Sequence, residues 1–141
     1  MIRKIVGLVV ACAASYAGVA WAGEWDAKSA PVHASELEKP LDRALEVAET
    51  APRQDTALQQ RTRDAAVVEM RHVYEAARGL VTKLRIGAGR GETEALLSQV
   101  RSMFDHARKT AREAVPQASV VPLLEEAEER ILELQKLYAQ D

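Results

Sequence analysis

A short glycine-rich segment separates two long amphipathic stretches, and it restricts the fold more than any other feature. Gly87-Ala88-Gly89-Arg90-Gly91 places three glycines within five residues, which favours a left-handed helix C-cap followed by a reversal of the chain. On both sides apolar residues recur every three or four positions: Ala66, Met70, Val73, Ala77, Leu80 and Leu84 before it, and Leu96, Leu97, Val100, Met103, Phe104, Ala107, Ala111 and Ala114 after it. This spacing predicts two helices that pack face to face as an antiparallel hairpin over residues 56–115.

Two further helices are predicted to cover the hairpin. Ser35-Glu36-Leu37-Glu38 has the pattern of a capping box and opens a shorter amphipathic helix. Pro40 lies four residues after Glu36, so the regular helix alternatively begins there, with proline in its first turn. The last helix follows Ser119, a candidate N-cap, and its outer face is acidic. The predicted fold is therefore all-α, an up-down-up-down four-helix bundle with one short helix.

The N-terminal residues have the pattern of a secretory signal peptide. Arg3 and Lys4 precede an apolar run over residues 5–19, and Ala20-Trp21-Ala22 fits a cleavage site. Cleavage after Ala22 predicts a periplasmic or secreted protein, with a signal peptide at 1–22, a disordered leader at 23–34 and a helical domain at 35–141. Alternatively, Val9-Val10-Ala11-Cys12 resembles a bacterial lipobox, which would anchor a lipoprotein at Cys12 and bring the chain to a membrane.

Composition excludes several classes of function. Cys12 is the only cysteine, so removal of residues 1–22 leaves none for disulfides, thiolate metal sites or cysteine nucleophiles. The same removal takes Arg3 and Lys4 and no acid, leaving 17 basic and 21 acidic residues. That balance gives no electrostatic basis for binding nucleic acid. No serine, histidine and acid are brought together by the helical register, so we expect no enzymatic activity.

Two histidines are the sharpest candidates for chemistry. If the turn pivots on Gly89, antiparallel pairing places His72 level with His106, and Glu69 level with Lys109. Both imidazoles then flank one groove, with Glu69 one helical turn from His72. Two imidazoles and a carboxylate form a ligand set for zinc, copper or nickel. The alternative is that both histidines are exposed boundary residues. The sequence thus predicts no cofactor as such, with zinc, copper or nickel at this pair as the alternative.

Two methionines raise a further alternative, a b-type haem carrier. Met70 and Met103 lie on the apolar stripes, where a thioether could serve as an axial ligand. The competing interpretation is that both fill gaps in the core. The absence of a CxxCH motif excludes covalently attached haem.

One segment resembles a known family. Gly91-Glu92-Thr93-Glu94-Ala95-Leu96-Leu97, followed by Asp105-His106-Ala107-Arg108, is similar to one repeat of the small periplasmic helical metal-binding proteins. Those proteins carry many His-Ala pairs, of which this chain has His106-Ala107, with Ser98-Gln99 where another histidine would stand. The resemblance implies divalent-metal binding at His106.

The leading hypothesis remains a non-enzymatic interaction or binding protein, whose helical faces contact a protein partner or a second copy of the chain.

Overall fold

Four helices make up the fold of the residues that the structure describes. The computed structural model describes residues 25–115 and 117–140, except for the side chains of residues 117 and 118. The helices are α1 (Ser29–Thr50), α2 (Ala57–Arg85), α3 (Arg90–Ala114) and α4 (Gln117–Tyr138), and no strand occurs within these ranges. The predicted signal peptide, its cleavage site and Cys12 lie outside the described residues. None of the described helices is long and apolar enough to span a membrane.

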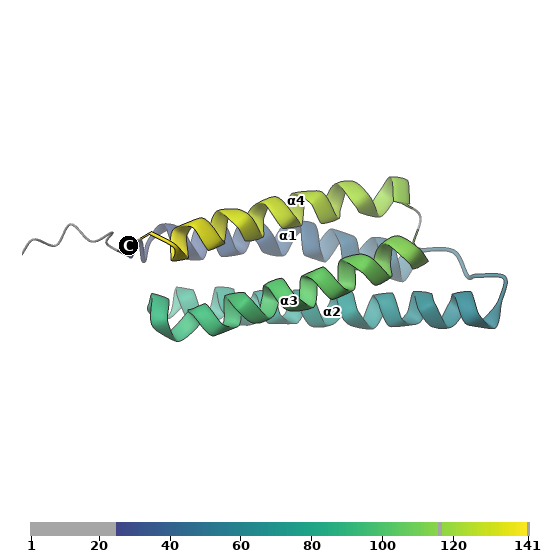
Figure 1. Ribbon diagram of the computed structural model, residues 1–141, viewed down its shortest axis with the longest axis horizontal. Coiled ribbons are helices and arrows are strands. Elements are labelled where there is room, and N and C mark those ends of the chain that lie inside the picture. The colour runs from purple at the N-terminus through teal and green to yellow at the C-terminus, as the bar shows by residue number, and fades with distance from the viewer. Residues whose placement is uncertain (1–24, 116, 141) are drawn as a thin grey trace, which may run out of the picture.

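The helices form the predicted up-down-up-down bundle (Figure 1). α2 packs most extensively against α3, α1 packs against both α2 and α4, and the contact between α3 and α4 is the smallest of the four. The core consists of the apolar stripe of each helix, with Phe104, Leu37, Leu41, Met70, Leu80, Leu124, Ile131 and Leu134 among its largest fully buried side chains. Each helix therefore hides one face, which is the arrangement that its amphipathic sequence requires.

The reversal between α2 and α3 is a Schellman motif centred on Gly87. The Gly87 amide donates to the Leu84 carbonyl over 3.1 Å, and the Ala88 amide donates to the Lys83 carbonyl over 3.0 Å. These bonds pair carbonyls that a helix end leaves without partners. They require a left-handed residue, and Gly87 has φ 91°. Its lack of a Cβ makes that conformation accessible.

The two glycines Gly87 and Gly79 offer a matched test of this turn. Gly87→Ala should lower the free energy of unfolding by about 1 kcal/mol, because an L-residue at that φ is strained. Gly79→Ala should raise it by about 0.5–1 kcal/mol, since Gly79 lies inside α2 with open space around its Cβ position. Urea denaturation of both variants measures the two effects. Equal shifts of the same sign would contradict the assignment of the turn.

The start of α1 corrects the sequence prediction. The predicted leader at 23–34 is described from Trp25 onwards, and α1 begins at Ser29 rather than near Ser35 or Pro40. Ala30 and Ala34 extend the apolar stripe by two turns and are buried, which supplies the packing that stabilises the extra turns. The Asp26 carboxylate accepts hydrogen bonds from the backbone amides of Lys28 and Ser29. Hydrogen bonding to Ser29 is the main cause that lowers the pKa of Asp26 below its usual value.

Two other helix starts can be compared with their predicted caps. At α2, where the spacing of Thr56 and Gln59 predicts a capping box, the cap is confirmed, because the Thr56 hydroxyl accepts from the Gln59 amide over 3.2 Å. The Gln59 side chain, however, accepts from that hydroxyl rather than reaching the Thr56 backbone amide. At α4 the prediction starts the helix three residues too late, since residues 117–119 already belong to it.

α2 extends beyond the bundle at its N-terminal end (Figure 1). No side chain of residues 57–65 is buried, and the first buried residue of the helix is Ala66. Leu58 is 75% exposed. The start of α2 is therefore the least covered part of that helix.

Candidate functional site

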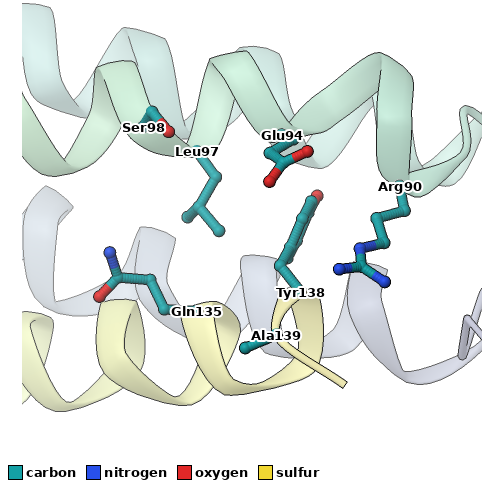
Figure 2. A pocket seen from close by; sticks show the side chains of 7 residues that line it. All are labelled: Arg90, Glu94, Leu97, Ser98, Gln135, Tyr138 and Ala139. Carbon is teal, nitrogen blue, oxygen red and sulfur yellow. The ribbon is translucent and has the colours of Figure 1, made fainter. Parts of the chain in front are cut away.

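A pocket of about 430 Å³ lies between the start of α3 and the end of α4. Figure 2 shows its lining: the α3 residues Arg90, Glu94, Leu97 and Ser98 face Gln135 and Tyr138 of α4 and Ala139, which follows that helix. Leu97 points into the pocket, while Glu94 and Arg90 lie on either side of the Tyr138 ring. The Arg90 guanidinium donates to the Gln140 carbonyl over 3.0 Å, which ties the end of the chain to α3.

A buried hydrogen bond stands beside this pocket. The Tyr138 and Thr93 hydroxyl oxygens are 2.6 Å apart. Thr93 has a single hydroxyl proton, and the Gly89 carbonyl oxygen lies 2.9 Å away to accept it, so Tyr138 is the donor to Thr93. Trp25 packs edge-on against Tyr138, with ring centroids 4.7 Å apart. The tyrosine thus joins α4, the start of α3 and the residues that precede α1.

The environment of Tyr138 makes its neutral form the stable one. Burial raises the pKa of the Tyr138 phenol above its usual value, and the Glu94 charge raises it further. The folded chain therefore holds the phenol proton more tightly than the unfolded chain does. The stabilisation that results is present below about pH 10 and is lost as pH rises through the folded pKa.

Tyr138→Phe tests this hydrogen bond and its linkage to pH. At neutral pH the variant should lose about 1 kcal/mol of unfolding free energy, because one hydrogen bond is missing. Above about pH 10 the difference from wild type should shrink, since phenylalanine has no proton to lose. Urea denaturation of both proteins between about pH 8 and about pH 11, a range that brackets the ordinary tyrosine pKa, measures it. A difference that stays constant or grows with pH would be inconsistent with a protonated, buried Tyr138.

The structure corrects the pairing predicted for the two hairpin histidines. His106 Nε2 lies 3.1 Å from Glu69 Oε1, whereas the prediction set Glu69 opposite Lys109 and His72 opposite His106. The turn occupies residues 86–89 and α3 begins at Arg90, so its centre precedes Gly89 and the register shifts by three residues. His106 and Glu69 are brought together, but His72 does not complete a set of three ligand atoms within 4.8 Å of one another.

Opposite charges meet where α3 packs against α4. Glu128 of α4 forms ion pairs with Arg101 over 3.3 Å and with Arg108 of α3. Arg101 also contacts Asp105 over 3.1 Å. These partly buried groups lie where the helix contact is smallest, so side-chain pairs supplement the thin apolar seam. Solvent screening limits the contribution of each pair.

A second cluster of potential ligand atoms was missed by sequence analysis. His33 and Glu36 of α1 and Glu133 of α4 place one ligand atom each within 4.8 Å of the others, and no other set in the described part of the chain meets this criterion. Arg130 Nη1 lies 3.0 Å from Glu133 Oε2 and 3.4 Å from Glu36 Oε2. Its hydrogen bond to Glu133 raises the pKa of Arg130 above its usual value. The sequence signal was the i,i+3 spacing of His33 and Glu36, which the prediction of a disordered leader concealed.

The two methionines proposed as haem ligands lie with the core. Met70 is fully buried, and Met103 packs against the core as a partly buried side chain.

Comparison of the chain with protein-family models, with curated proteins and with solved structures finds no match.

Proposed function

We propose that this chain is a non-enzymatic interaction protein of the cell envelope that binds a helical partner along the exposed start of α2. The observation that carries this proposal is the overhang at the start of α2, over whose first nine residues, 57–65, no side chain is buried by the rest of the described chain. Export rests on the signal-peptide pattern of residues 1–22, and the absence of catalysis is expected from the sequence.

An exposed apolar face starts on the overhang and continues along α2. Leu58, Ala65 and Val68 recur at i, i+7 and i+10, which keeps them on one helical face, and all three are exposed. Burying one leucine side chain against a partner contributes about 1.5–3 kcal/mol. A second amphipathic helix packed along this face would therefore bury apolar surface that the chain's own helices leave exposed.

A hollow beside Leu58 adds shape to this surface. A pocket of about 210 Å³ lies between the start of α2 and the end of α3, and is lined by Gln54, Leu58, Gln59, Thr62, Glu113 and Ala114. A side chain of a bound helix could enter this hollow while its apolar face covers Leu58. The proposed surface consequently has a polar rim, as protein interfaces commonly do.

Site-specific photo-crosslinking in intact cells tests the interaction. A photoreactive phenylalanine analogue at Leu58 or Val68 should form a discrete adduct, and a Leu58→Glu/Val68→Glu background with the analogue at Ala65 should lose it. The same analogue at Asp42, an exposed residue of α1, is the control. Mass spectrometry of the adduct distinguishes a second copy from another protein. No adduct, or equal adducts at Asp42 and Leu58, would contradict the proposal.

The alternatives have less support. Divalent-metal binding through His72 and His106 has in its favour only the contact of His106 with Glu69, and equal zinc affinity in wild type and His72→Ala/His106→Ala would remove it. The haem hypothesis has no structural observation in its favour, and a purified protein without a Soret band would end it.

A further inference from the structure

We propose that His33, Glu36 and Glu133 form a site for one divalent transition-metal ion that joins α1 to α4. His33 Nδ1 lies 3.9 Å from Glu36 Oε2 and 3.8 Å from Glu133 Oε2. Two ligands come from one turn of α1 and the third from α4, and these two helices pack against each other. The site is distinct from the proposed contact surface on α2.

The imidazole supplies the observation that distinguishes this cluster from a group of surface acids. His33 Nδ1 is shielded from solvent and has no hydrogen-bond partner, although the side chain is 34% exposed overall. A polar nitrogen removed from water without a partner is unfavourable. It faces two carboxylate oxygens that lie beyond hydrogen-bonding distance of the nitrogen. A bound cation would give the nitrogen a partner and would take the place of Arg130 as the partner of both oxygens.

The spacing fits a small metal ion after a modest contraction. Ligand atoms around tetrahedral zinc, with bonds of about 2.0 Å, lie about 3.3 Å apart. The observed separations of 3.8 and 3.9 Å exceed this by about half an ångström, which side-chain rotation in partly exposed residues can supply. Water would complete the coordination. One imidazole and two carboxylates select zinc or its transition-metal neighbours over magnesium or calcium, which prefer oxygen alone.

Arg130 occupies the same negative centre and would compete with the metal. Its Nη1 atom contacts both carboxylates, at 3.4 Å from Glu36 and 3.0 Å from Glu133. The guanidinium is itself partly exposed, so it can turn into solvent when a metal ion enters. Removal of this cation should therefore strengthen metal binding, because the carboxylates would lose the internal partner that offsets their charge.

Zinc titration of tag-free protein near neutral pH tests the site, by calorimetry and by thermal unfolding. The wild-type chain should bind one zinc ion, and its melting temperature should rise by about 5–10 °C at about 100 times the Kd. His33→Ala should weaken binding at least about tenfold, since loss of a mere supporting residue already costs that much. Magnesium and calcium should cause no shift.

Two further variants separate binding at this cluster from binding elsewhere on the chain and from a folding defect. His72→Ala/His106→Ala should bind zinc as tightly as wild type, because those histidines lie outside the cluster. Arg130→Gln should bind more tightly, a gain that a folding defect would not produce. The proposal is overturned if wild type shows no zinc-dependent shift up to about 1 mM, the weak end of protein–ligand affinity. It is also overturned if His33→Ala binds like wild type, or if Arg130→Gln fails to tighten binding.

Discussion

The apolar seam between α2 and α3 is the contact on which the rest of the structure depends. It is the most extensive helix contact in the bundle, and the turn at Gly87 fixes how the two helices are aligned. A slip along this seam would carry His106 away from Glu69 and would change where α4 meets α3. The hairpin thus sets the positions of both the α3–α4 pocket and the overhang of α2.

The helix pairs of the bundle pack against one another to unequal extents. α1 and α4 cover the hairpin as a pair that packs closely together, whereas α3 and α4 meet over a smaller area. That smaller contact is supplemented by Glu128 with its two arginines and by the Tyr138 bond to Thr93. At the other end α2 runs past its neighbours. The surface to which we assign partner binding is therefore one that the intramolecular packing leaves uncovered.

The helix count, the hairpin and its core face were predictable because apolar spacing alone determines them. The register was not, because it depends on which of three glycines becomes left-handed, and only Gly87 does. The start of α1 was missed because Pro31 and His33 made residues 23–34 look like a polar leader, although Ala30 and Ala34 continue the apolar stripe of the helix. The same omission hid the His33 cluster, whose third member, Glu133, lies near the other end of the chain and is brought close only by the packing of α1 on α4.

The alignment of the hairpin can be measured directly with cysteine pairs in a chain that carries Cys12→Ser. We predict that a short bismaleimide joins Glu69→Cys/His106→Cys faster than His72→Cys/His106→Cys, because three residues shift a helix position by about 4.5 Å. Faster cross-linking of the cysteines at positions 72 and 106 would instead support the helix alignment in which the turn pivots on Gly89. It would contradict the placement of the turn at Gly87, and with it the position of every surface that the turn sets.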